Sequence, residues 1–171
     1  MKILGLDPGL RITGYGVIST TNIGGSASGG ESCGKNFKLI EAGVIRTALK
    51  DKIAQRLTFL HKELLGLIDE VKPEICILEN LYSHYKHPRT SILMGHARGA
   101  ILLACAQRGL PIVDYSAKRV RKAVLGNGNA SKEQIQRMVQ SILGLKSVPS
   151  PNDVSDALAL AIAHVYMDKI K

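Results

Sequence analysis

Apolar residues along the 171-residue chain fall into short runs typical of β-strands and longer stretches with the 3.6-residue period of helices. The run at 74–79 is apolar at nearly every position, as expected for a strand covered on both faces. Between 50 and 71, leucine and isoleucine recur on one helical face, and Pro73 ends that pattern. The predicted strands are 3–7, 12–19, 38–46, 74–79 and 111–115, and the predicted helices are 50–71, 91–107, 116–125, 131–142 and 151–168.

Three strands followed by alternating helices and strands are typical of the α/β class. We expect a mixed five-stranded sheet with helices on both faces, in a single domain of residues 1–171, because this length supports one well-buried core. Residues 20–36 are crowded with Gly and Ser and cannot bury apolar area, so we interpret them as a mobile hairpin loop. The last helix is apolar on all sides over 157–163, which predicts that it is buried.

The charge of the chain narrows the class of partner. Lys and Arg number 23 against 14 acidic residues, giving a formal net charge of +9. This excess favours a polyanionic partner, nucleic acid above all, without distinguishing DNA from RNA. No apolar run is long enough to span a bilayer, and Asp7 interrupts the N-terminal run too early for a signal peptide. We therefore expect a cytoplasmic protein with no membrane partner.

Four carboxylates stand at the ends of predicted elements and are the candidate catalytic residues. Asp7 and Glu79 end apolar strands, and Asp153 and Asp156 lie at the start of the last helix. Asp7 could instead be a turn residue of the Asp-Pro-Gly segment, and Glu79 a solvated strand end. Asp153 could act as a helix-capping acid after Ser150. Asp156 lies beside the buried helix, where an acid needs a partner such as a cation.

The four acids acquire a chemical meaning if they converge. Their mutual repulsion must then be relieved by protonation or by bound cations. Carboxylates and water are ligands suited to Mg²⁺ or Mn²⁺, and two such ions are the usual device for phosphodiester hydrolysis. The sequence places the acids where convergence is possible but does not demonstrate it.

Four motifs, in this order and spacing, resemble the RuvC family of Holliday-junction resolvases. They are LGLDPG at 4–9 with TGYG at 13–16, ILEN at 77–80, GHARG at 95–99 and DVSDALA at 153–159. The resemblance runs from residue 1 to about residue 164. It implies a ribonuclease-H-like fold and a structure-selective DNA endonuclease that makes paired nicks in four-way junctions during homologous recombination and DNA repair. It also implies a homodimer, with the branch-migration proteins RuvA and RuvB as partners.

The same resemblance assigns roles to particular residues. Two Mg²⁺ ions per subunit, for which Mn²⁺ can substitute, would be held by Asp7, Glu79, Asp153 and Asp156. Water activated by metal would be the nucleophile, with no covalent intermediate. An aromatic residue after Glu79 would stack on junction bases. Tyr82 is the best match and Tyr85 the alternative, and either could instead pack beneath its own loop.

Basic residues near the last helices are candidate DNA contacts. The segment 118–122 carries four positive charges in five residues on a predicted helix. Lys118, Arg121 and Lys122 share a face that would present a basic stripe to a phosphate backbone, although a solvated helix face has the same pattern. By resemblance, Lys118, Arg121 and Lys132 are the best candidates for backbone contacts. Arg98, in an otherwise apolar helix, is expected to pair with an acid.

Several points stay open at this stage. The segments 20–36 and 80–89 look longer than the family pattern, and the roles of the first of them and of the histidines at 84, 87 and 96 are undetermined. A nuclease of the same fold acting on structured RNA, or an inactive DNA-binding scaffold, are the rival functions, and the four acids argue against the second. An actin-like ATPase is a further alternative, but that architecture needs a second, similar half, and 171 residues leave no room for it. The cleavage sequence preference is also open, as is the dimer interface, for which the candidate is helix 91–107 with Ile92, Leu93, Ala97, Ile101 and Leu102 apolar.

Overall fold

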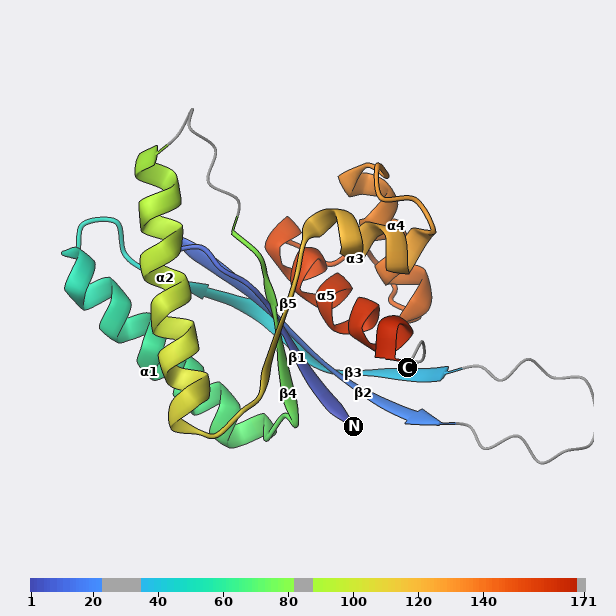
Figure 1. Ribbon diagram of the computed structural model, residues 1–171, viewed down its shortest axis with the longest axis horizontal. Helices are drawn as coiled ribbons and strands as arrows, with labels where there is room; N and C mark the ends of the chain where they lie inside the picture. The colour runs from blue at the N-terminus through green and yellow to red at the C-terminus, as the bar shows by residue number, and fades with distance from the viewer. Residues whose placement is uncertain (23–34, 82–87, 169–171) are drawn as a thin grey trace, which may run out of the picture.

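A mixed five-stranded sheet forms the centre of the computed structural model, which describes residues 1–22, 35–81 and 88–168 (Figure 1). The strand order is β3-β2-β1-β4-β5. The first three strands pair antiparallel, and the last two add parallel to β1. The strands are β1 (Lys2–Asp7), β2 (Ile12–Asn22), β3 (Lys35–Arg46), β4 (Ile75–Glu79) and β5 (Ile112–Tyr115).

Helices cover both faces of this sheet, as predicted (Figure 1). One face packs against α1 and α2, and the other against α5, with α3 and α4 outside it. Along β1 the side chains alternate between the two cores: Leu4 and Leu6 join the first, and Ile3 joins the second. The helices are α1 (Ile53–Val71), α2 (Pro88–Gln107), α3 (Ala117–Leu125), α4 (Lys132–Ile142) and α5 (Asn152–Asp168).

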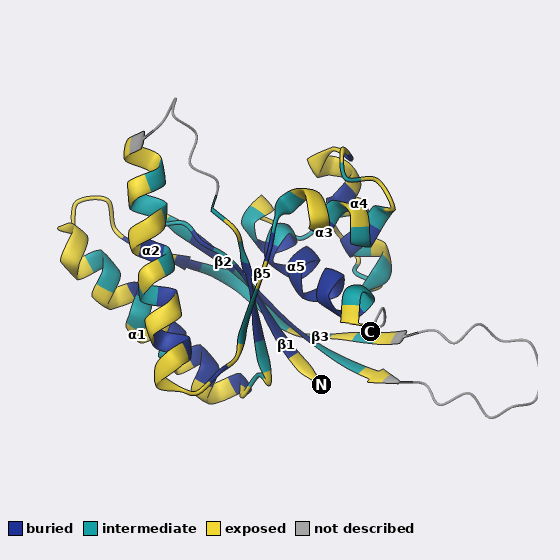
Figure 2. Ribbon diagram, viewed as in Figure 1, coloured by how far each residue is buried: buried dark blue, intermediate teal, exposed yellow. Residues whose placement is uncertain are grey.

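The last helix is the central element of the second core. Apart from the half-buried Asp156, residues 154–165 of α5 are buried, which confirms the prediction from its all-round apolar pattern (Figure 2). By contrast, α1 and α2 are buried on one side and exposed on the other. In the described residues no helix is both long and apolar enough to cross a membrane.

The β2–β3 hairpin extends further than the sequence predicted. Thr20, Thr21 and Asn22 pair with Phe37, Asn36 and Lys35, so the strands reach into the segment assigned to the 20–36 loop. Pairing with β3 carries the strand past position 19, where the two β-branched threonines suit it, and the Gly and Ser residues begin only after position 22. Residues 23–34 lie outside the described residues, and a mobile loop there stays a prediction.

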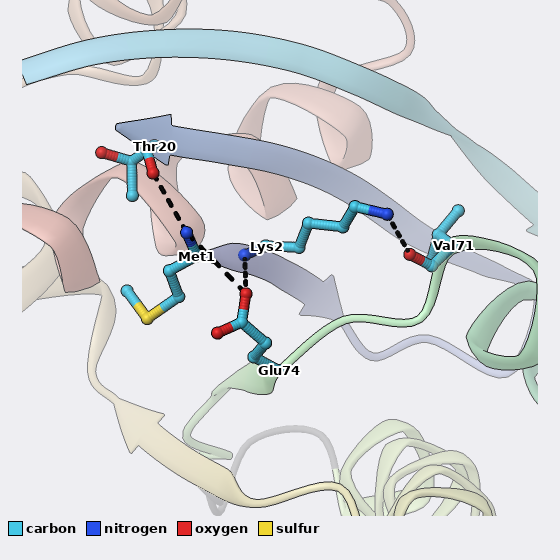
Figure 3. A network of polar contacts seen from close by, with 5 residues as sticks. All are labelled: Met1, Lys2, Thr20, Val71 and Glu74. Carbon is cyan, nitrogen blue, oxygen red and sulfur yellow. Dashed lines mark hydrogen bonds and ion pairs between the residues drawn. The ribbon is translucent and has the colours of Figure 1, made fainter. Parts of the chain in front are cut away.

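Polar contacts hold the amino ends of β1 and β4 together (Figure 3). The backbone N–H of Lys2 donates to Glu74 Oε1 at 2.7 Å, and the backbone N–H of Glu74 donates to the Lys2 carbonyl at 2.9 Å. The Lys2 ammonium donates to the Val71 carbonyl at 3.0 Å, and the Met1 amino group to the Thr20 carbonyl at 3.1 Å. These bonds fix the register of two parallel strands at the end away from Asp7. Their carboxyl ends therefore finish level with each other.

Close backbone contacts place α5 directly on β1 and β2. A Cβ at Gly5 would lie 2.0 Å from the Ala157 carbonyl oxygen, and one at Gly14 would lie 2.1 Å from the Asp153 carbonyl oxygen. Real Cβ atoms do not approach that closely, so only glycine allows the helix to lie this near the sheet. The glycines of the first two strands therefore determine where the first turn of α5 lies.

Candidate acidic active site

The four predicted carboxylates meet at one edge of the sheet. Leu6 of β1 lies opposite Leu78 of the parallel strand β4, so the next residues, Asp7 and Glu79, end side by side. Asp7 also pairs across β2 with Gly14, the glycine beneath Asp153 of α5. The helix begins at Asn152, so Asp153 is its second residue and Asp156 follows one turn later. Two strand ends and one helix start thus bring acids from distant parts of the chain together.

Burial and mutual repulsion make this cluster costly to ionise. Desolvation, followed by the charges of Glu79 and Asp156, raises the pKa of Asp7 from 3.8 to about 8. Desolvation also raises the pKa values of Glu79 and Asp156, against the opposing effect of nearby cations. The carboxyl groups of Asp7 and Glu79 interact directly, which raises the pKa of Asp7 and lowers that of Glu79. The cluster holds more negative charge than this environment stabilises unaided.

A cavity of about 280 Å³ opens between this edge and helices α3 and α4. Asp7, Glu79 and Asp156 form one wall, and Arg121 and Lys132 face them. The Lys132 ammonium lies 3.8 Å from Asp156 Oδ2. Both cations lower the pKa values of Glu79 and Asp156. We call this space the acidic cavity; it joins an acidic wall to two basic side chains that could meet a phosphate group.

The donor set of this cluster fits a hard divalent cation. Carboxylate oxygens are the ligands that Mg²⁺ and Mn²⁺ take, and the raised pKa values show that the site gains stability from added positive charge. Within the described residues, no three carboxylate, imidazole or thiol groups stand close enough together to hold one ion among them. The acids thus fit bound cations by charge and by ligand type, while their spacing in this structure does not group three of them around one ion position.

Arg98 on α2 supports the acidic edge from behind. Its Nη1 donates to the backbone carbonyl of Glu79 at 2.8 Å, and its Nη2 donates to Asp114 Oδ1 on β5 at 2.7 Å. The ion pair with Asp114 confirms the predicted acidic partner. The sequence did not reveal the bond to Glu79, because every residue has a backbone carbonyl and nothing in the pattern marks that one. The guanidinium ties the end of β4 to β5 and to α2.

The other predicted site residues differ in position. Arg121 and Lys132 line the acidic cavity, whereas Lys118 and Lys122 lie exposed on α3 and do not line it. The stem of Lys118 instead lies near Gly128. His96 is exposed on α2. Tyr82, His84, Tyr85 and His87 lie outside the described residues, so base stacking by Tyr82 or Tyr85 stays a prediction.

Comparison with known proteins places this arrangement in a family. The family model described as crossover junction endodeoxyribonuclease RuvC matches residues 3–164. This chain belongs to the RuvC family. A relative from Caldicellulosiruptor saccharolyticus, named crossover junction endodeoxyribonuclease RuvC, is 41% identical over 165 residues, which cover 96% of this chain and 92% of that protein. The resemblance read from the four sequence motifs is confirmed.

Solved structures of RuvC proteins share the fold. The structure of Thermus thermophilus RuvC superposes with a TM-score of 0.85 at 30% identity, covering 99% of this chain and 96% of that one. The structure of T. thermophilus RuvC in complex with a Holliday junction substrate gives a TM-score of 0.86 at 29% identity, with the same coverage. The predicted ribonuclease-H-like sheet with helices on both faces is therefore confirmed.

Proposed function

We propose that this chain is a metal-dependent endodeoxyribonuclease that resolves four-way DNA junctions by paired nicks during homologous recombination and DNA repair. The observation that carries the proposal is that Asp7, Glu79 and Asp156 line one wall of a cavity whose opposite wall is basic, with Asp153 adjoining Asp7 on the other side. Membership in the RuvC family supplies the substrate class, because a family structure contains a Holliday junction substrate. We propose that residues 1–171 form one nuclease domain and that it acts in the cytoplasm.

The four acids would hold two Mg²⁺ ions, with Mn²⁺ able to replace them. Bound there, the metal would supply an activated water and charge stabilisation of the leaving oxygen. The chain's own groups do the rest. Arg121 and Lys132 lie across the cavity from the acids, where they would bind the phosphate and neutralise charge. Arg98 holds the Glu79 backbone in place, and buried α5 fixes the position of Asp156.

Cleavage of synthetic four-way junctions tests this proposal. Wild-type protein with Mg²⁺ or Mn²⁺ should cut them, while Asp7→Asn and Glu79→Gln should bind junctions without cutting. Asp51→Asn is the matched control, because Asp51 is an exposed acid away from the acidic cavity. Folded wild-type protein that binds junctions but leaves them uncut with either metal would refute the catalytic role. Cleavage of structured RNA hairpins in preference to DNA junctions would favour the RNA nuclease instead.

Paired nicking calls for two active sites, and we propose a homodimer formed through α2. The helix faces two ways: Ala97 and Ile101 are buried in the first core, while Ile92 and Leu103 are 60% and 54% exposed. Leu102 is also exposed. Gly95 and Gly99 lie along the helix between Ile92 and the two leucines, and they have no side chain to keep a partner at a distance. An apolar, small-residue face of this kind suits a second copy of the same helix. The apolar stripe predicted for the interface is thus divided between the core and this face.

Analytical ultracentrifugation tests the dimer. Leu103→Glu should convert a dimer into a folded monomer that cuts junctions poorly, whereas Phe59→Glu, at a 44% exposed site on α1, should leave the dimer intact. A Leu103→Glu variant that remains dimeric would place the interface elsewhere. We further propose DNA contacts by Lys118, Lys122 and Tyr82, and RuvA and RuvB as partners, by analogy with the family.

A further inference from the structure

A second hollow borders the same acids on the opposite side of the sheet edge. Its volume is about 500 Å³, and it lies between the 8–12 turn, α1 and the first turns of α2. Asp7 and Met94 line both this hollow and the acidic cavity, and Asp153 lines this one alone. The acids therefore stand on a ridge between two hollows. A strand cut at that ridge would pass both hollows.

The chemistry of the second hollow differs from that of the first. Its walls are mainly apolar, and Leu10, Leu49 and Leu93 contribute to them with Met94. Leu49 is 62% exposed, so its side chain is accessible to a ligand that enters the hollow. Apolar walls offer nothing to a phosphate, whereas the face of a nucleobase gains from burial against them. Beside a catalytic edge, the occupant that matches both features is a nucleotide of the cleaved strand.

Two arginines supply the polar part of such a site. Arg56 is already committed, since its Nε donates to Thr47 Oγ1 at 2.9 Å and its Nη2 to the Leu10 carbonyl at 3.1 Å. It stiffens the turn that forms the floor. Arg11 is exposed at the rim, and among the described residues its side chain has no hydrogen-bond or ion-pair partner. A cation there is placed to meet the phosphate of a nucleotide whose base lies inside.

We infer that this hollow, which we call the base subsite, receives the nucleobase next to the scissile phosphate, with Arg11 on the adjoining phosphate. The inference rests on the proposed junction nuclease and adds a determinant of substrate choice. An unstacked base seated against Leu49 and Met94 would favour sequences at the crossover whose bases leave the stack easily. Cleavage preference would then depend on this subsite as well as on the acidic cavity.

A double-mutant cycle between protein and DNA tests the base subsite. The DNA change is a single abasic nucleotide on the 5′ or the 3′ side of the scissile phosphate, and the protein change is Leu49→Ser. On one of the two sides, the abasic nucleotide should slow single-turnover cleavage by wild-type protein about tenfold. Leu49→Ser should slow cleavage of the intact junction by a similar factor. On the abasic junction, Leu49→Ser and wild-type protein should cleave at the same rate. Ile40→Ser, at an exposed apolar site on β3, should behave as wild type on every junction.

The inference would be overturned if the effects of Leu49→Ser and of the abasic nucleotide on the cleavage rate multiply. If Leu49→Ser slows intact and abasic junctions equally on both sides, no base of the cleaved strand occupies the hollow. Junction affinities for the same combinations, measured without metal, report the coupling even where cleavage is absent. Failure of the nuclease proposal is thus separable from failure of the base subsite. Arg11→Gln gives a second readout, because losing one phosphate contact should reduce the salt dependence of junction binding by about one unit of slope.

Discussion

Replacing Asp7 with Asn removes the carboxylate that the fold tolerates least, and so tests how the site depends on bound cations. Burial and the neighbouring acids raise the pKa of Asp7 from 3.8 to about 8. Below pH 4 the group is protonated in folded and unfolded chains alike and has no effect on stability. As the pH rises from 4 toward 8, the unfolded chain releases the proton while the folded one keeps it. Metal-free stability should therefore fall across that window.

The size of this effect follows from the shift. At pH 7 Asp7 is ionised in the unfolded chain, where its pKa is 3.8, and protonated in the folded one. This difference corresponds to about 4 kcal/mol of stability lost from the metal-free fold. Rearrangement of the side chains relieves part of this cost, so we expect Asp7→Asn to stabilise the metal-free protein by about 1–3 kcal/mol. For a chain of this length, that is a rise in Tm of about 3–10 °C.

Thermal unfolding in EDTA between pH 5 and pH 8 measures the prediction. The Tm advantage of Asp7→Asn over wild type should grow with pH, while Asp51→Asn, at an exposed acid, should track wild type throughout. Adding Mg²⁺ should stabilise wild type, because an ion that binds only the folded state raises its stability, and should affect Asp7→Asn much less. An Asp7→Asn variant no more stable than wild type at pH 8, or an advantage independent of pH, would refute the reasoning.

Three further outcomes follow from the same geometry. Arg98→Lys should keep junction binding but raise the Mg²⁺ concentration needed for half-maximal cleavage several-fold, because an ammonium cannot hold the Glu79 carbonyl and an acid at once in the same fork geometry; an unchanged metal requirement would contradict this role. Gly14→Ala should lower stability by about 2–4 kcal/mol in chemical denaturation, since its Cβ would collide with the α5 backbone, whereas Gly66→Ala in open space on α1 should stabilise slightly. Lys132→Gln should move the acidic limb of the pH–rate profile to higher pH, because Lys132 lowers the pKa values of the acids that it faces; a limb that stays in place would assign that effect to Arg121.

The periodic pattern of the sequence predicted every strand and helix of the described residues, with boundaries that differ by a few residues. The largest difference lies at the β2–β3 hairpin, where pairing across the sheet extended the strands into a polar segment. The pattern of residues within one segment does not show such pairing, because the stabilisation comes from hydrogen bonds to the partner strand. The buried state of α5 was predictable for the opposite reason, since an all-round apolar helix has no solvent face.

The candidate site was predictable as a set of residues and not as a place. Asp7 and Asp153 each had an ordinary explanation in the sequence, as a turn residue and a capping acid. They come together because α5 approaches Gly14 closely. From the sequence alone, a glycine in a strand does not indicate which segment of backbone will pack against it. Strand order decides the rest, because Asp7 and Glu79 meet only if β4 lies beside β1. Both facts are properties of packing across the sheet.

Helix α2 connects the proposed dimer interface with the acidic edge, because it carries both the exposed apolar face and Arg98. Helix α2 carries the exposed face with Ile92 and Leu103, and between these two positions it carries Arg98, whose guanidinium is bound to the Glu79 carbonyl. Because both features belong to one helix, a partner that shifts α2 would also shift the guanidinium bound at the end of β4. We infer that dimer formation helps to place Glu79. A monomeric variant should then lose cleavage through a weaker response to metal as well as through weaker junction binding, even though its four acids are intact.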